Sequence, residues 1–241
     1  MIKFGSLNVK DIRIGETQVK KVAVGSEVIW EKSTSPLPSG YRQVEYLQSS
    51  GTQWINSNYY PNLDTLLEMK YRYIFENSGR MCWAFGSRNT TSSGGFGFIL
   101  NYFGSTTDES ISVFSDNTYP NNMFRENLRN QDIIVQQSKN GLYIDGIRKY
   151  NNRQTTFQCS YPCLLFWGST EGTGDSGRLP YGRIYYCKIW ESDVIQRDFI
   201  PCLDPNDRPC MFDLVTQQPF YNQGTGTFGY ETMDGTFVAP T

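Results

Sequence analysis

The sequence predicts an all-β chain, in which a small N-terminal β-repeat precedes a two-sheet antiparallel jelly-roll sandwich. Two observations support this prediction. The first thirty of the 241 residues repeat an apolar pattern every ten residues, and the remainder holds many short apolar runs separated by turn clusters. No convincing helix of more than two turns is found, and the best helical candidate is the stretch 192–199.

The N-terminal β-repeat, residues 1–32, is built from three repeat units of ten residues each, which we call decads. Each decad holds an apolar i, i+2 pair that ends in glycine, as in Ile12-x-Ile14-Gly15, which suits a short strand closed by a turn. We expect the three decads to supply three strands of one small sheet. Such a sheet buries too little apolar surface to be stable alone, so it should dock on another surface. The docking residues we expect are Phe4, Ile12, Ile14, Val22, Val24 and Trp30.

A linker separates this repeat from the body of the chain. Residues 33–39 are rich in Ser and Pro and have no periodic apolar face. We therefore place the domain boundary there and assign residues 40–241 to the jelly roll.

The body holds short, turn-bounded apolar runs. Asn140-Gly141 and Asp145-Gly146 flank one of them and predict tight turns on both of its sides. The strands we expect lie at 66–75, 96–100, 111–114, 133–135, 142–144, 163–167 and 184–190.

The composition excludes several classes of protein. The chain has no His, which rules out Ser-His-Asp and Cys-His catalysis. Its formal charge of -2 and the lack of a basic run argue against nucleic acid as a partner. A mean hydropathy of -0.49 argues against membrane insertion.

The six Cys are expected to be reduced and buried as small hydrophobic side chains, because the first residues do not resemble a signal peptide. Their spacings lack the paired C-x2-C of zinc ribbons. Glu171 and Asp175 offer oxygen ligands for Ca²⁺ in a Gly-rich loop, but the loop lacks the spacing of a dedicated calcium site. We expect an ordinary solvated loop there and no cofactor.

Several segments of the body resemble one superfamily. Residues 40–55, which open Gly40-Tyr41-Arg42, are similar to the start of concanavalin A-like, laminin-G-like jelly rolls of gut bacteriophages and their prophages. Residues 141–146 resemble the Y-x-D-G hairpin of that superfamily, and residues 182–190 resemble its late core strand. Segments at 197–202, 211–215 and 220–228 are similar to its closing part. The resemblance implies a fold that hosts lectins, glycosidases and purely structural domains.

The N-terminal repeat carries a second resemblance. Residues 19–31, from Val19 to Glu31, look like the strand repeats that open many phage tail and head-fibre proteins. Together the two resemblances imply a structural protein of a bacteriophage virion, as a tail or head fibre or a capsid decoration. They imply a location at the virion surface, synthesis in the host bacterial cytoplasm, and other virion proteins as partners of the repeat. A homotrimer and a host-surface or mucosal glycan ligand stay open.

An enzymatic alternative starts from the E-x-D-x-x-E strand motif of glucanases of this fold. The nearest match is Glu191-Ser192-Asp193, but Gln196 stands where the last carboxylate belongs. We therefore expect no enzyme and no catalytic residue. A glycan-active hydrolase with other carboxylates, and a bacterial surface lectin, are the alternatives.

Aromatic side chains beside Gly, Asn and Ser suit a sugar platform, because a flat apolar ring face and nearby amide groups match the two kinds of surface on a sugar. Core packing is the competing interpretation, and we favour it for Trp83 and Trp167 because they lie in apolar runs. The glycan-binding candidates are Trp54, Tyr59, Tyr60, Tyr102 and Tyr119.

Overall fold

The structure is a computed structural model that describes residues 3–4, 7–8, 13–14, 17–19, 21–24, 27–31, 36–74, 82–89, 95–100, 109–115, 123–152, 156–170, 173–174 and 181–241. The contacts divide the chain into two compact units, Met1–Pro38 and Ser39–Thr241. Within the described residues every regular element is a β-strand and none is a helix. The all-β prediction is confirmed.

The N-terminal unit contains three antiparallel hairpins, one from each decad. The register leaves two residues between the paired strands, and the sequence there is Gly5-Ser6, Gly15-Glu16 or Gly25-Ser26. Gly followed by a polar residue is a common two-residue hairpin connection. The strands are β1 (Lys3–Phe4), β2 (Leu7–Asn8), β3 (Arg13–Ile14), β4 (Thr17–Gln18), β5 (Lys21–Val24) and β6 (Glu27–Glu31).

The predicted single sheet of three strands is therefore wrong, since each decad supplies two strands that pair with each other. The second half of each decad is therefore the partner of its first half. Of the expected docking residues, Phe4, Ile14, Val22, Val24 and Trp30 lie in these strands, and Ile12 lies outside the described residues.

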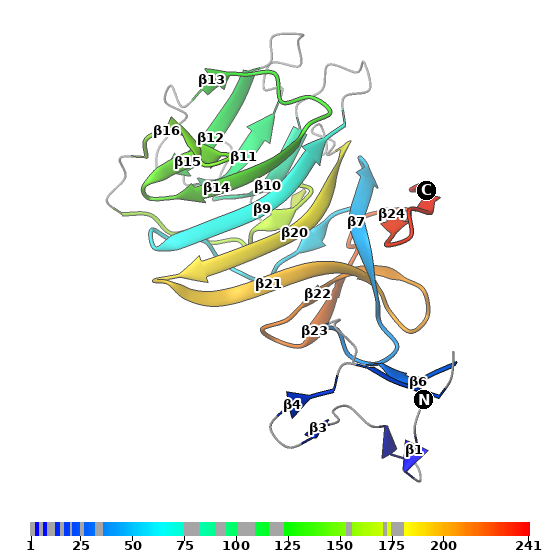
Figure 1. The fold of residues 1–241 in the computed structure, drawn as a ribbon. Helices are drawn as coiled ribbons and strands as arrows, with labels where there is room; N and C mark the ends of the chain where they lie inside the picture. Colours follow the sequence, from blue (N-terminus) through cyan, green and yellow to red (C-terminus); the bar gives the residue numbers. More distant parts are fainter. Residues whose placement is uncertain are drawn as a thin grey trace. The chain divides into compact units, whose positions relative to one another are not determined.

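The body consists of two sheets (Figure 1). The larger has the strand order β16-β15-β14-β9-β20-β21-β7-β24-β25, with β22 and β23 added alongside β21. β20 pairs with β9 along one edge, and along the other with β7 and then β21. The strands are β7 (Arg42–Ser50), β9 (Thr65–Tyr73), β14 (Asp132–Ser138), β15 (Gly141–Ile144), β16 (Ile147–Tyr150), β20 (Tyr181–Glu191), β21 (Val194–Leu203), β22 (Pro209–Asp213), β23 (Gln218–Tyr221), β24 (Gly229–Thr232) and β25 (Phe237–Val238).

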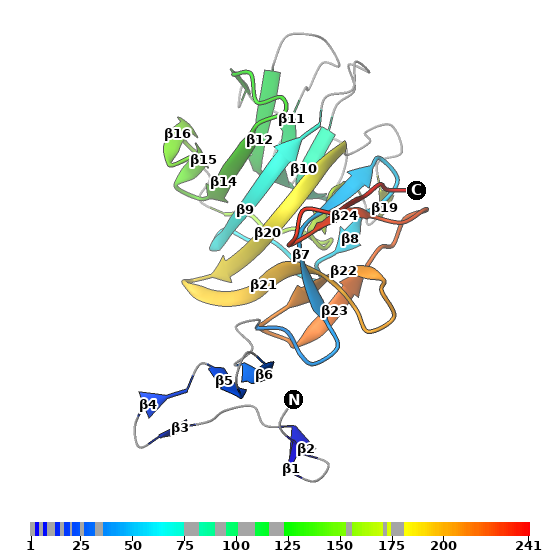
Figure 2. The same cartoon turned by 45° about the vertical axis from the view of Figure 1, so that its right-hand side comes forward.

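The smaller sheet has the order β13-β12-β11-β10-β17-β8, and β18 joins it as a parallel neighbour of β10. Its strands β10, β11 and β12 lie behind β14, β9 and β20 in both views of the body (Figures 1 and 2). The strands are β8 (Ile55–Asn56), β10 (Cys82–Arg88), β11 (Gly95–Leu100), β12 (Glu109–Ser115), β13 (Met123–Arg125), β17 (Leu164–Leu165), β18 (Gly168–Thr170) and β19 (Thr173–Gly174).

The main core lies between the two sheets. Strand β9 shows why: its buried and half-buried residues alternate strictly, so Leu67, Met69 and Tyr71 all point to one side. They pack in one cluster with Phe85 and Phe96 of the smaller sheet. The body is therefore a sandwich of the predicted jelly-roll type.

A second, smaller core cluster contains Trp83, Ile99 and Val113. The Trp83 ring lies on two glycines, because a Cβ added at Gly86 or Gly97 would come within 2.4 Å or 2.6 Å of it. No larger side chain fits under the ring. Trp83 is 0% exposed and Trp167 is 8% exposed, which confirms the core interpretation of both.

The helical candidate 192–199 is wrong. Ser192 and Asp193 form a tight turn with positive φ, and Val194 begins β21, which pairs back onto β20. The polar, irregular sequence there adopts a strand because hairpin pairing with β20 outweighs its weak local preference.

The predicted strand positions, the turn at 145–146 and the buried cysteines are confirmed. Strands occur at all seven predicted places, and Asp145 and Gly146, both with positive φ, turn β15 into β16. All six Cys are free and buried. No helix of the described segments is long and apolar enough to cross a membrane.

Candidate functional site

The segment that enters and leaves β8 alternates between the core and the surface. Gln53, Ile55, Ser57 and Tyr59 are buried, while the even-numbered residues between and after them face outward. We call the four outward-facing residues, Trp54, Asn56, Asn58 and Tyr60, the Trp54–Tyr60 row. Trp54 and Asn56 are half-buried, Asn58 is exposed, and Tyr60 is 51% exposed.

Backbone and hydroxyl hydrogen bonds hold the inner side of the segment. The backbone N–H and the hydroxyl of Ser57 both donate to the carbonyl of Cys163, at 3.1 Å and 2.5 Å. The N–H of Cys163 in turn donates to the carbonyl of Tyr59 at 2.8 Å. The segment is thereby fixed to the chain just before β17.

Tyr59 contributes to this anchoring and not to the surface. Its hydroxyl lies 2.8 Å from the hydroxyl of Thr65 and donates to Glu191 Oε2 at 3.1 Å. Burial, together with the neighbouring Glu191 carboxylate, raises the pKa of Tyr59 well above its usual value, so the phenol stays neutral. The side chain is 6% exposed and offers no ring face to a ligand.

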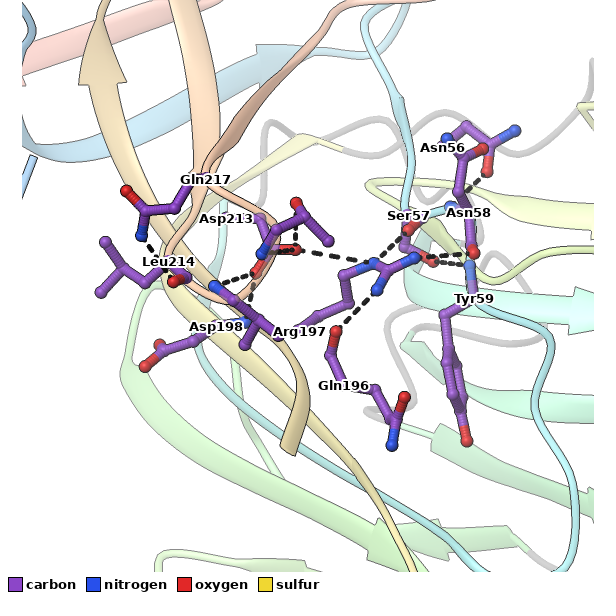
Figure 3. A network of polar contacts seen from close by, with 12 residues as sticks. Asn56, Ser57, Asn58, Tyr59, Gln196, Arg197, Asp198, Asp213, Leu214 and Gln217 are labelled. Atoms are coloured by element: carbon purple, nitrogen blue, oxygen red, sulfur yellow. Dashed lines mark hydrogen bonds and ion pairs between the residues drawn. The ribbon is translucent and has the colours of Figure 1, made fainter. Parts of the chain in front are cut away.

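Arg197 of β21 supports the row from the other sheet (Figure 3). Its Nε donates to the carbonyl of Ser57 at 2.9 Å, and its Nη2 donates to the carbonyl of Asn58 at 3.0 Å. The guanidinium also bonds the carbonyl of Gln196 and lies 3.8 Å from Asp213. Because Asn58 has φ of 51°, this contact holds the backbone in a left-handed conformation that is strained for most residues.

Asp213 fixes Arg197 in turn. The carboxylate is fully buried and accepts hydrogen bonds from the N–H of Asp198 and of Val215, at 2.8 Å and 3.1 Å. It also accepts one from the Thr216 hydroxyl at 2.7 Å. A buried carboxylate satisfied in this way is a rigid support for a cation.

The loop after β23 packs against Trp54. The N–H of Trp54 donates to Asn222 Oδ1 at 3.1 Å, and its carbonyl accepts from the N–H of Gln223 at 2.8 Å. A Cβ at Gly224 would lie 1.8 Å from the carbonyl oxygen of Thr52, so only glycine permits this approach. One side of Trp54 is held, and the residue is half-buried against the main core.

The row leaves polar groups unused. Asn56 Oδ1 accepts from the N–H of Asn58 at 2.8 Å, which aligns the two residues. In the described part of the chain, the Nδ2 groups of Asn56 and Asn58 and the hydroxyl of Tyr60 have no hydrogen-bond partner. The arrangement offers an exposed aromatic ring, two amide groups and the accessible part of an indole along one line.

The two carboxylates of the incomplete glucanase motif, Glu191 and Asp193, lie in different surroundings. Glu191 is engaged by Tyr59, and Asp193 lies in the turn between β20 and β21. Among the described residues, no three His, Cys, Asp or Glu side chains are grouped as metal ligands would be.

The structure places the glycan-binding candidates of the sequence analysis in different positions. Trp54 and Tyr60 lie together in the row, whereas Tyr59 is turned inward. Tyr102 and Tyr119 lie outside the described residues. So do Glu171 and Asp175 of the Gly-rich loop that was considered for Ca²⁺. The sequence prediction did not include Asn56, Asn58 and Arg197. The alternation of buried and outward-facing positions along residues 53–60 could have indicated that the two Asn face outward.

Comparisons with known proteins return no match: no family model, no curated protein and no solved structure is similar to this chain.

Proposed function

We propose that this chain is a non-enzymatic structural protein of a bacteriophage virion. Its N-terminal repeat docks on other virion proteins, and its body is displayed at the virion surface, where the Trp54–Tyr60 row binds host-surface or mucosal glycans. The observation that carries the binding part is the row itself, in which unused amide groups stand between two aromatic side chains on a rigid segment.

The chemistry of the row suits a neutral sugar. Pyranose rings present apolar C–H faces that pack on aromatic rings, and their hydroxyls pair with amide groups. Arg197 and Ser57 hold the backbone in place, so little ordering free energy is needed on binding. The six residue steps from Trp54 to Tyr60 would reach at most about 20 Å if fully extended, and the left-handed Asn58 shortens this span, which leaves room for a short stretch of glycan.

A single row supplies few contacts, and we expect weak affinity per chain. Many copies on one particle raise the effective concentration of sites and compensate for that weakness. The proposal therefore concerns binding by arrays of this protein.

The hairpin unit supports the docking part of the proposal. An isolated two-stranded hairpin is at best marginally stable in water. The three hairpins are separate two-stranded sheets, so their stability must come from contacts outside each hairpin. Other virion proteins, or sister chains in a homotrimer, would provide such contacts.

Docking is tested by deleting residues 1–32. The truncated body should stay folded and soluble but should no longer be incorporated into particles when it is supplied in place of the full chain. Incorporation at the full-length level would contradict the docking role.

Glycan binding is tested on arrays of host-surface and mucosal glycans, with whole particles and with multivalent full-length chain. Tyr60→Ala should abolish the signal, and Asn58→Ala should reduce it strongly. Ile147→Ala is the control, because it removes an apolar side chain from β16 that is at least as exposed as Tyr60. Blank arrays for the unaltered protein would overturn the binding role.

Turnover assays on the same glycans test the non-enzymatic part. Hydrolysis that is lost on changing Glu191 or Asp193 would show that the chain is a hydrolase instead. The expected result is no turnover.

A further inference from the structure

Two cysteines face each other across the hairpin formed by β21 and β22. Cys202 and Cys210 are direct cross-strand partners, and their sulfur atoms lie 3.4 Å apart. Both side chains are fully buried. We propose that this pair is an oxidation site at which a small disulfide oxidant installs an intrachain Cys202–Cys210 disulfide.

The two strands bring the Cα atoms into the range that a disulfide spans, and the Cβ atoms, which lie further apart in a hydrogen-bonded pair than in a non-hydrogen-bonded one, must approach each other as the bond forms. Paired positions in an antiparallel ladder alternate between hydrogen-bonded and non-hydrogen-bonded. The N–H of Asp204 donates to the carbonyl of Arg208 at 3.0 Å, and Cys202 and Cys210 stand two positions further along. They are therefore also a hydrogen-bonded pair, for which the Cα atoms lie about 5.5 Å apart. Disulfides span Cα separations of about 4.4–6.8 Å.

Two prolines support this assignment. Pro201 pairs with Met211, and Leu203 pairs with Pro209, so one proline stands in each pair next to the cysteines. Proline has no N–H, and these non-hydrogen-bonded pairs need none from it within this ladder. The sulfurs need to approach by only about 1.4 Å to reach a bond length of about 2.05 Å.

Three of the other four cysteines have different neighbours. Cys82 lies 3.3 Å from the hydroxyl of Tyr71, and the thiols of Cys159 and Cys163 point to the carbonyls of Ser87 and Leu164. Among the described residues, Cys202 and Cys210 are two cysteines whose sulfur atoms lie within hydrogen-bond distance of each other. The structure thus singles out one of the fifteen pairings that six cysteines allow.

The chemistry needs an oxidant, for which glutathione disulfide is the probe. The thiolate of one cysteine attacks a glutathione sulfur, forms a mixed disulfide and releases one glutathione thiol. The second cysteine then displaces the other glutathione, so two electrons and two protons leave the protein for two glutathione thiols. The hydrogen bond with Cys210 and burial raise the pKa of Cys202, which keeps the Cys202 thiol protonated and makes its reaction slow without local opening.

The test equilibrates the full chain with a glutathione redox buffer in two ways, from the folded state and during refolding from denaturant. The refolding arm removes burial as an obstacle. Remaining thiols are then alkylated under denaturing conditions and mapped by mass spectrometry. We expect both arms to lose two of the six alkylatable thiols, with a crosslinked pair of peptides that contain Cys202 and Cys210.

Cys159 and Cys163 are the internal control, since they are also buried and close in sequence, and they should stay alkylatable. Cys202→Ser should leave Cys210 alkylatable and no crosslink. The proposal is overturned if the refolded, native-like chain keeps both thiols free in an oxidising buffer, or if Cys202 or Cys210 pairs with another cysteine. A melting temperature a few degrees higher in the oxidised chain would agree with closure of a short loop.

Discussion

The two units of this chain are built from the same kind of alternating strand, but the strands find their partners at different distances along the sequence. In the N-terminal unit Phe4 pairs with Leu7, three residues away. In the body Gln48 of β7 pairs with Arg183 and with Gly229. Each hairpin is thus a local structure, whereas central strands of the body such as β7 depend on distant parts of the chain. A change in the body should spread, and a change in one hairpin should stay there.

The largest effect is expected from Gly97→Ala in the smaller sheet. The added methyl group would meet the Trp83 ring at 2.6 Å and the carbonyl oxygen of Phe85 at 2.7 Å. Because a backbone atom cannot yield without moving its strand, we expect a loss of about 3 kcal/mol in unfolding free energy, measured by urea denaturation.

Gly146→Ala is the matched control for that change. No heavy atom lies within 4 Å of its added Cβ, but φ is 77°. Only backbone strain of about 1 kcal/mol should result. Equal losses at the two glycines would show that Trp83 is not tightly packed on Gly97.

Acid should destabilise the body through Asp204. Burial raises the pKa of this carboxyl, but hydrogen bonds from the N–H and side chain of Arg208, from the N–H of Asn206 and from the Tyr221 hydroxyl outweigh it and lower the pKa to about 2. The unfolded value is higher, so the folded body releases this proton more readily. The stabilisation is present above about pH 4 and is lost as the pH falls toward 2.

The contribution amounts to about 2 kcal/mol, from a downward shift of roughly two units. Thermal unfolding of the full chain and of Asp204→Asn between pH 6 and 2 measures it. The variant should be less stable at pH 6, and the gap should narrow in acid. A constant gap would mean that other carboxyl groups carry the acid response.

A smaller loss is expected from Arg197→Ala, about 1–2 kcal/mol, because the carbonyls of Ser57 and Asn58 lose their donors but lie near the surface. The row should lose its fixed shape, so glycan signal falls more than stability does. Arg197→Lys keeps the charge but not the forked geometry and should restore stability more than binding.

The smallest effect is expected from deleting the N-terminal unit, and it tests the comparison of the two units most directly. Removal of residues 1–32 should change the melting temperature of the body by no more than about 1 °C, because its core is made within Ser39–Thr241. Differential scanning calorimetry of both chains decides this. A drop of several degrees would mean that the hairpins belong to the cooperative unit of the body.

The sequence located strands better than it located their partners. Alternation and turn signals identified β9, β14 and β20, because a half-buried strand leaves that pattern in its own residues. The pairing within each decad was missed, since periodicity of ten residues is equally compatible with one strand or two per repeat. Within the candidate site, Arg197 carries no local signal at all, because the carbonyl it supports is 140 residues earlier in the chain.

The position of β7 has a mechanical consequence. This strand is the first of the body after Pro38, and it lies inside the larger sheet, with β20 and β21 on one side and β24 on the other. A pull on the N-terminal end of β7 that is directed along the strand would load hydrogen bonds on both sides at once. Those bonds share the force and must break together, whereas a strand at an edge would peel away bond by bond. The strand that connects the body to the N-terminal unit is therefore one that resists being pulled out of the sheet.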